Sequence, residues 1–302
     1  QTENAVRSVT DLNKAMTLVD MTMSNMSGSS LNSLKQQSLS MAKDLSTATK
    51  TVTDAVTIYA NENESVSSML NKAQPTVLLS AASGMSSSSS ADAIQGILNQ
   101  FNLSEDQAMH VADTVEKLSS EIALDFSKGC DTISQSIATS GSVVNEAGMS
   151  FEKYAALVST TAEKTRQSGS VIGNAFKTIF SRISRSKDGL TTDAEMSDAE
   201  AALKSVGVSV RGADGDLRDI SDTLDNLNEV WGTLNHSQRS YVAEMAAGVR
   251  QKNIFEAAMD SYNKALQLEQ DALDSDGTAM KINEKRADSI NGKMEKLSAT
   301  MT

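Results

Sequence analysis

The chain has 302 residues, a formal net charge of −12 and an aromatic content of 4%. The acidic balance argues against a general nucleic-acid binder, because neutralising phosphate groups requires a basic surface. A single cysteine, Cys130, excludes an internal disulfide, and two widely separated histidines, His110 and His236, offer little for a zinc site.

The composition predicts an all-α fold. Small and flexible residues dominate, and proline occurs once, at Pro75. Core volume must then come from small residues, leucine and methionine, which favours closely packed helices over a β-sandwich. The longest apolar run, at residues 77–82, is far shorter than the ~20 residues that span a bilayer, so no transmembrane helix is expected. Because the chain starts at Gln1 without a signal sequence, we expect a piece of a longer protein.

The first predicted segment, residues 1–60, contains an uninterrupted heptad pattern. Apolar residues follow one another at steps of four and three, the spacing that places them on one edge of a helix. This seam indicates either self-association as a coiled coil or packing of the helix into its own domain. The candidate self-association residues are Ala5, Val9, Leu12, Met16, Val19, Met23 and Met26.

Residues 61–190 form a predicted helical core region. We expect Pro75 to begin a separate helix, since proline is tolerated in the first turn and not in the interior. The serine run at 86–90 has the composition of a flexible linker, and we favour the alternative that it is an exposed loop that ends in a helix cap. Ser104 and Gln107 have the spacing of a capping box, which predicts that another helix starts there.

A predicted helix over residues 173–186 has a basic exposed side. An acidic stretch follows it, so the basic side is a candidate to pair with acidic residues within or between subunits. The alternative is an ordinary solvated helix face, which is what most charge runs are. The residues of this candidate basic interface are Lys177, Arg182, Arg185 and Lys187.

Residues 191–302 are predicted to hold an acidic helix, a short β-hairpin near 207–218 and the C-terminal helices. Val208 and Leu217 flank an Asp-Gly pair at 214–215, which is the pattern of a tight hairpin. The whole sequence therefore predicts an all-α fold with one hairpin, elongated or bundle-like, with heptad seams.

Motifs that carry chemistry are weak in this sequence. The acidic turns at 214–216 and 274–277 lack the bidentate carboxylate that a calcium loop needs, so no metal site is expected. Glu64 and Ser65 resemble the catalytic pair of lytic transglycosylases, but the glycine and asparagine that follow in that family are missing. There is no phosphate loop or dinucleotide glycine pattern. We expect no catalytic, cofactor-binding or metal-binding residues, no cofactor, and no enzyme.

Several stretches resemble the core region of phage tail tape measure proteins. They are residues 172–186, residues 207–231, the run from Ala246 to Gln251 and residues 255–262. The likeness follows the family's order over nearly the whole chain, and it includes no catalytic signature.

The resemblance implies a virion structural protein of the tail lumen or tail tip, made in the host cytoplasm, that helps to set tail length during assembly and to eject the genome. It implies a homo-oligomer, with a trimer among the forms, and contacts with tail tube proteins, tail tip proteins and tail assembly chaperones. No specific nucleic-acid binding is expected, and membrane contact is expected only after ejection. A continuous helix of 302 residues would reach only ~450 Å at ~1.5 Å per residue, so we expect a folded or terminal module rather than the ruler itself.

Two alternatives stay open. One is a peptidoglycan-degrading module carried on a tape measure protein, in which Glu64 would act. The other is a membrane-active module that uses the apolar stretch at 77–85 after ejection.

Overall fold

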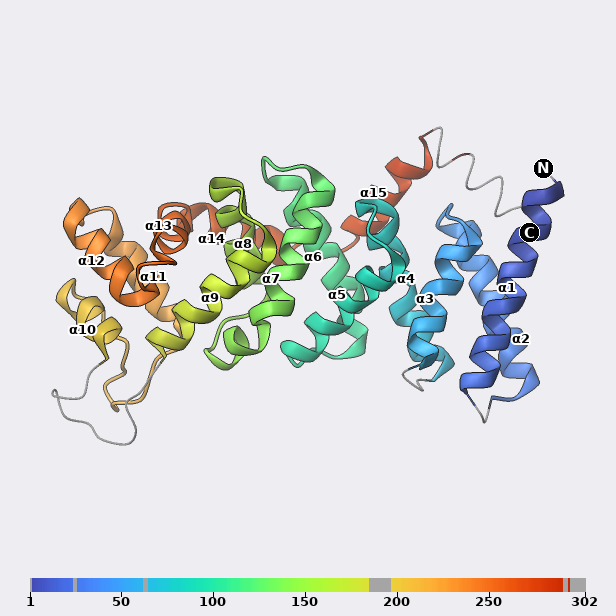
Figure 1. Ribbon diagram of the computed structural model, residues 1–302, viewed down its shortest axis with the longest axis horizontal. Coiled ribbons are helices and arrows are strands. Elements are labelled where there is room, and N and C mark those ends of the chain that lie inside the picture. Colours follow the sequence, from blue (N-terminus) through green and yellow to red (C-terminus); the bar gives the residue numbers. More distant parts are fainter. Residues whose placement is uncertain (1, 24–25, 62–64, 185–196, 290–292, 294–302) are drawn as a thin grey trace. The chain divides into compact units, whose positions relative to one another are not determined.

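The computed structural model (Figure 1) describes residues 2–23, 26–61, 65–184, 197–289 and 293. Side chains are described from Thr10 onwards. Regular structure in these ranges is helical, with no β-sheet, so the predicted all-α fold is confirmed. The chain divides into two compact units, which are described separately. Unit 1 comprises residues 1–117 and 275–302, and unit 2 comprises residues 118–274.

Unit 1 is built from the N-terminal helices and the last helix of the chain. They are α1 (Thr2–Thr22), α2 (Gly28–Asp44), α3 (Thr49–Asn61), α4 (Val66–Ser83), α5 (Ser87–Gln100), the 3-10 turn η1 (Glu105–Gln107), α6 (Ala108–Glu121), whose last turn belongs to unit 2, and α15 (Thr278–Ala287).

Serine caps decide where several of these helices begin. The Ser27 hydroxyl accepts the Ser30 backbone N–H at 3.1 Å at the start of α2, as expected for an N-cap. The Ser104–Gln107 capping box is confirmed, and Gln107 Oε1 accepts the Ser104 N–H at 3.1 Å. The interpretation of 86–90 as a loop is wrong, because Ser86 caps α5 and the following serines form its first turn.

Pro75 lies inside α4, so the prediction that it begins a separate helix is also wrong. A proline in a helix interior lacks the N–H for the hydrogen bond to the preceding turn and costs ~3 kcal/mol. Around it α4 is deeply buried, with Val77, Leu78 and Leu79 fully inaccessible. Burying each such side chain contributes about 1.5–3 kcal/mol, which is enough to keep the helix continuous.

The core of unit 1 includes a polar cluster between α3, α4 and α5. The Tyr59 hydroxyl bonds the Thr76 hydroxyl at 2.7 Å. Lys72 is fully buried, with its Nζ 4.7 Å from the centre of the Tyr59 ring and 2.8 Å from Gln95 Oε1, to which it donates. The cluster shows that a buried lysine is stabilised here by an aromatic face and an amide oxygen.

The last helix of the chain returns to unit 1. In Figure 1, α15 lies beside α4, and the two helices are in contact. Asn283 Nδ2 and the Arg286 guanidinium both donate to the Leu45 carbonyl oxygen, each at 3.0 Å. These bonds satisfy a carbonyl at the C-terminal end of α2, where no helical partner is left.

Unit 2 is a second group of packed helices. They are α7 (Phe126–Glu146), α8 (Phe151–Thr165), α9 (Gly169–Ile183), α10 (Asp198–Ser205), α11 (Ile220–Trp231), α12 (His236–Ala247), α13 (Lys252–Asp260) and α14 (Tyr262–Leu273).

Helices α7 and α9 of unit 2 pack closely against each other. A Cβ added at Gly169 would lie 2.4 Å from the Thr132 carbonyl oxygen, and one added at Gly173 would lie 2.7 Å from the Ser136 carbonyl oxygen. The Ser136 hydroxyl donates to the Gly169 carbonyl at 2.8 Å. The two glycines, four residues apart on one face of α9, therefore allow the backbones to touch.

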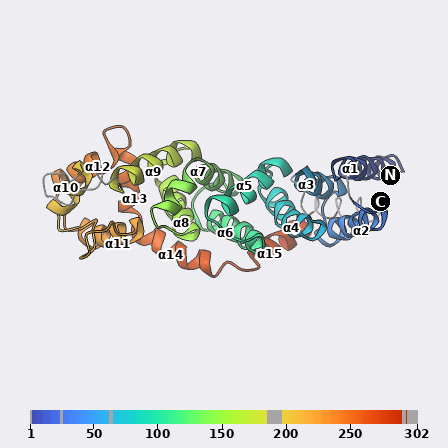
Figure 2. The ribbon, with the colours of Figure 1, turned by 90° about the horizontal axis from the view of Figure 1, so that it is seen from below.

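Helix α8 is the centre of unit 2 and is almost fully buried along its length. Its Tyr154 ring meets Phe176 of α9 edge-on, with ring centres 5.6 Å apart. Along another side, α14 runs next to α8, as Figure 2 shows. Lys153 of α8 donates to both carboxylate oxygens of Asp225, which also accepts the Tyr262 hydroxyl at 2.9 Å.

The hairpin predicted near 207–218 is not formed. A single antiparallel bridge joins Arg211 and Leu217, with no strand on either side. The Asp-Gly pair does make a turn, since Gly215 has a φ of +89°. A ladder needs several paired residues, and the backbone bonds across this turn are too few to form one.

Candidate functional site

The loop between α10 and α11, residues 206–219, is the most distinctive stretch of the sequence. Val208 and Val210 are buried and fix its first half. Across the turn, the Arg218 N–H donates to the Val210 carbonyl at 2.9 Å and the Gly212 N–H donates to the Asp216 carbonyl at 2.9 Å. The loop is therefore closed by backbone bonds at its base.

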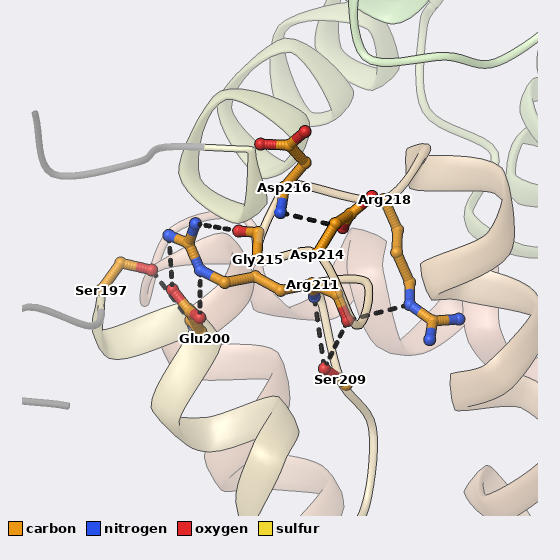
Figure 3. A network of polar contacts seen from close by, with 8 residues as sticks. All are labelled: Ser197, Glu200, Ser209, Arg211, Asp214, Gly215, Asp216 and Arg218. Atoms are coloured by element: carbon orange, nitrogen blue, oxygen red, sulfur yellow. Dashed lines mark hydrogen bonds and ion pairs between the residues drawn. The ribbon is translucent and has the colours of Figure 1, made fainter. Parts of the chain in front are cut away.

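Arg211 ties this loop to α10 (Figure 3). Its Nε donates to Glu200 Oε1 at 2.8 Å, and another guanidinium nitrogen donates to the Gly215 carbonyl oxygen at 2.9 Å. The Glu200 carboxylate is buried, so this pair is shielded from solvent on the carboxylate side. Glu200 and Arg211 each have a partner of opposite charge, so the pair supports the loop.

Asp214 stabilises the turn through a bond to a residue of the same turn. Asp214 Oδ1 accepts the Asp216 backbone N–H at 3.1 Å, the bond of an Asx-type turn. In the residues that the structure describes, no three His, Cys, Asp or Glu side chains are grouped so as to hold a metal ion.

The end of the loop is fixed to the turn between α7 and α8. The Ile220 N–H donates to the Ala147 carbonyl at 2.7 Å, and the Ser221 hydroxyl donates to the Gly148 carbonyl at 3.1 Å. Gly148 has a φ of +80°, and a Cβ there would collide with Asp219. The position requires glycine for both its backbone angle and its close contact.

Trp231 anchors the other end of α11. Its Nε1 donates to Asp260 Oδ1 at 2.9 Å, and its ring meets Phe255 edge-on. Burial raises the pKa of Asp260, but hydrogen bonds from Trp231 and Lys164 outweigh it, so the net pKa is lowered. The loop and α11 are thus fixed within unit 2 at both ends of the helix.

The candidate basic interface is only partly described. Lys177 is exposed on α9. Arg182 donates to the Met245 carbonyl oxygen from two nitrogens, at 3.1 and 3.2 Å, and so joins α9 to α12 within the chain. Arg185 and Lys187 lie outside the described residues. Whether these four residues form an interface stays a prediction.

The candidate seam on α1 lies mainly on the side that faces the chain's own core. Leu12, Met16 and Val19 are buried, and α1 packs against α3. Met23 and Met26 are half-buried, and the side chains of Ala5 and Val9 are outside the described part.

A second polar cluster, on α6 of unit 1, was missed from the sequence. Asp113 Oδ1 accepts the Ala279 N–H at 2.7 Å and its Oδ2 accepts the Gly277 N–H at 3.0 Å, so this carboxylate caps α15. One turn later, Glu116 is fully buried and neither carboxylate oxygen has a hydrogen-bond partner. Burial, with the charge of Asp113 adding to it, raises the pKa of Glu116 to about 8. In the sequence, the feature that indicates this cluster is that both acidic residues lie among the apolar residues of α6.

Comparison with known proteins identifies the family. The model of the family described as phage-related minor tail protein matches residues 35–248, which is more than half of the chain. A tape measure protein of Pneumococcus phage Dp-1 is 23% identical over 269 residues, which is 88% of this chain. A probable tape measure protein of Escherichia phage P2 is 23% identical over 194 residues, which is 64% of this chain.

In both relatives the match covers 22% of the relative's own length, so the chain spans about a fifth of each. No solved structure matches the chain. The family assignment therefore rests on sequence, and it agrees with the resemblance noted in residues 172–186 and 207–231. The chain belongs to the family of phage-related minor tail proteins, and it has a structural role in a phage tail.

Proposed function

We propose that the chain is a folded module of a tape measure protein, located in the tail lumen or at the tail tip, which contributes to tail assembly, tail length and genome ejection. The observation that carries this proposal is the family match over residues 35–248. The pneumococcal phage tape measure protein, aligned over most of the chain, supports the same role.

The helix lengths favour a module over an extended ruler. The longest helices, α1 and α7, have 21 residues each, which corresponds to ~32 Å at ~1.5 Å per residue. In each unit these helices pack against their neighbours rather than continuing end to end. Folded in this way, the chain would add far less to tail length per residue than a continuous helix.

An in-frame deletion of unit 2 from the complete phage gene distinguishes an extended ruler from a folded assembly module. An extended ruler predicts tails shorter by roughly 240 Å at ~1.5 Å per deleted residue. A folded assembly module predicts a strong loss of completed tails, while those that form keep nearly their usual length. Electron microscopy of lysates gives both the number and the length of tails. Normal numbers of infectious, full-length tails would contradict any role of this module in assembly.

The proposed partners are further copies of the chain, with a trimer among the forms, and the tail tube, tail tip and tail assembly chaperone proteins. Cross-linking of purified virions, followed by mass spectrometry of peptides from this chain, tests the tube and tip contacts. Cross-links only to capsid proteins would contradict the proposed location.

The two alternative functions receive no specific support. Glu64, the residue on which the peptidoglycan-degrading hypothesis depended, lies outside the described residues, and Ser65 caps α4 by accepting the Ser68 N–H at 3.1 Å. In the described part of the chain, none of the helices has the length and apolar character needed to span a bilayer. The structural role is therefore the one that we propose.

A further inference from the structure

Helix α15 covers part of unit 1 but buries little apolar surface of its own. Of its ten residues, Ala279 and Asn283 are buried, while Met280 and Ile282 are half-buried. The helix that it contacts, α4, is much more apolar, and residues 77–79 at its centre are fully inaccessible. Since apolar burial is the main force that docks a helix onto a core, this force is weak for α15.

Polar contacts hold both ends of α15 instead. At its start, the Asp113 carboxylate of α6 accepts two backbone N–H groups. Near its end, Arg286 donates to the carbonyl oxygens of Leu45 and Ser46, at 3.0 and 2.9 Å. Water can replace each of these bonds when the helix leaves, so their net contribution to docking is modest. A helix with few buried apolar contacts and replaceable polar ones can open while the rest of its unit stays folded.

A group beside the first of these contacts opposes the closed state. Glu116 follows Asp113 by three residues in α6, so the two side chains are neighbours on that helix. Glu116 is fully buried, and neither of its carboxylate oxygens has a hydrogen-bond partner. A buried polar group without a partner is destabilising, and contact with water relieves it. Because Asp113 bonds directly to the start of α15, departure of α15 brings water to this side of α6.

We propose that α15 is a strap that opens while the other helices of unit 1 stay folded, with Asp113 holding it closed and Glu116 favouring its release. Opening uncovers the part of α4 that α15 contacts and gives unit 1 a closed form and an open form. The inference goes beyond the proposed function, because it concerns unit 1 alone and does not depend on the place of the chain in a tail.

The first test compares two buried thiols in the full 302-residue chain. Cys130 is replaced by alanine, and either Ala279→Cys in α15 or Ala55→Cys in α3 is added as a reporter. Both alanines lie in unit 1 and are fully inaccessible, so the two reporters are matched. With an excess of a thiol reagent, the Ala279→Cys thiol should react at least ~100-fold faster than the Ala55→Cys thiol. Equal rates would overturn the strap, because both thiols would then react only through unfolding of the whole unit.

Hydrogen exchange of the unmodified chain makes the same comparison without an added cysteine. Amides of residues 282–287 in α15 should exchange at least ~100-fold faster than amides of residues 53–60 in α3. If fast labelling of Ala279→Cys were accompanied by equal protection of the two helices, the substitution itself would have loosened α15, and the proposal would be wrong.

The second test assigns opposite roles to the two acidic residues. In the Ala279→Cys reporter chain, Asp113→Ala should speed labelling at least ~10-fold, because two backbone donors lose their acceptor. Glu116→Leu should slow it at least ~10-fold, because an apolar side chain of comparable size gains nothing from contact with water. An unchanged rate in Asp113→Ala would contradict its role as the contact that holds the strap, and an unchanged rate in Glu116→Leu would contradict its role in release.

The matched control is Ile94→Ala, which changes a fully inaccessible core residue of α5 that makes none of the polar contacts to α15. The cavity that it leaves should speed labelling of the Ala55→Cys reporter at least ~10-fold and leave the Ala279→Cys rate unchanged. Equal acceleration of both reporters would show that α15 and α3 open together, which would also overturn the strap.

Discussion

Asp113 and Ala279 are 166 residues apart in the chain, yet Asp113 Oδ1 accepts the Ala279 backbone N–H at 2.7 Å. The other carboxylate oxygen accepts the Gly277 N–H, so one buried side chain satisfies two donors at the start of α15. A nearby pair, Thr114 and Ser275, adds a hydroxyl contact of 3.2 Å. The return of the chain to unit 1 is therefore fixed at a small number of polar contacts on α6.

Replacement of Asp113 by alanine should loosen α15. Two backbone donors lose their acceptor, and each such loss in a buried site costs about 1–3 kcal/mol. Hydrogen exchange followed by mass spectrometry should show at least ~10-fold faster exchange in residues 275–287. The control is Asp276→Ala, because that side chain is exposed and lies 3.4 Å from the His110 ring without bonding to the α15 backbone donors that Asp113 accepts. Unchanged protection of α15 in Asp113→Ala would contradict the capping role.

Glu116 predicts a dependence of stability on pH. Its pKa is raised from an ordinary value of 4.5 to about 8, first by burial and then by the charge of Asp113. Between these pH values the folded chain holds a proton that the unfolded chain has lost. Stability therefore falls as pH rises from 4.5 towards 8, with a slope of up to ~1.4 kcal/mol per pH unit, and changes no further from this source above pH 8.

Glu116→Gln should flatten this profile, because the amide cannot ionise. Urea unfolding at several pH values between 5 and 9, followed by circular dichroism, measures the slope. The matched control, Glu229→Gln, changes an exposed glutamate of α11 and should keep the slope of the unmodified chain. An identical slope in Glu116→Gln and the unmodified chain would show that Glu116 does not titrate as described.

Two glycine substitutions should have opposite effects on stability, because Gly173 lies in the α7–α9 contact and Gly96 of α5 has open space beside it. Gly173→Ala should destabilise unit 2 by about 1–3 kcal/mol, since the new methyl group would lie 2.7 Å from a backbone oxygen of α7 and force the helices apart. Gly96→Ala, in α5, meets nothing within 4 Å and should stabilise the chain by up to ~1 kcal/mol through helix propensity. Thermal unfolding by calorimetry compares them, and a lower Tm for Gly96→Ala than for Gly173→Ala would refute this packing.

The Glu200–Arg211 pair predicts a non-additive effect. Arg211→Ala leaves a buried carboxylate without its cation and should cost about 3–5 kcal/mol. Adding Glu200→Gln removes that charge and should restore part of the loss. The control Arg218→Ala removes only one exposed bond to the Arg211 carbonyl and should cost under ~1 kcal/mol. Strictly additive losses in the double variant, measured by urea unfolding, would rule out a coupled pair.

Features that depend on neighbouring residues, such as helix caps and turns, could be predicted from the sequence. Contacts between segments far apart in the chain could not. The Ser104–Gln107 capping box was predicted because the cap and its partner are three residues apart. Pro75 was misplaced because the burial that outweighs its helix cost comes from other helices. The Asp-Gly pair predicts the turn correctly because a turn depends on neighbouring residues. It does not predict whether strands form beside the turn, and here Glu200 of α10 holds Arg211 of the loop instead.

The same distinction applies to the candidate surfaces. The heptad pattern predicts an apolar edge on α1, and the fold shows that Leu12, Met16 and Val19 of this edge pack inside unit 1. Leu18 and Met21 of the same helix are apolar as well, yet they are 52% and 76% exposed. Asp113 and Glu116 left only a weak signal, because their partners and their burial depend on residues far along the chain.

The discontinuity of unit 1 has a consequence for synthesis on the ribosome. Residues 118–274 are contiguous, so all of unit 2 emerges before Ala279 can reach Asp113. Unit 1 is completed only when α15 leaves the exit tunnel, although its first helices are made earliest. During that interval the Asp113 carboxylate and the Leu45 carbonyl lack their partners from α15. A nascent chain paused at Asp274 would therefore display the docking site of its own last helix.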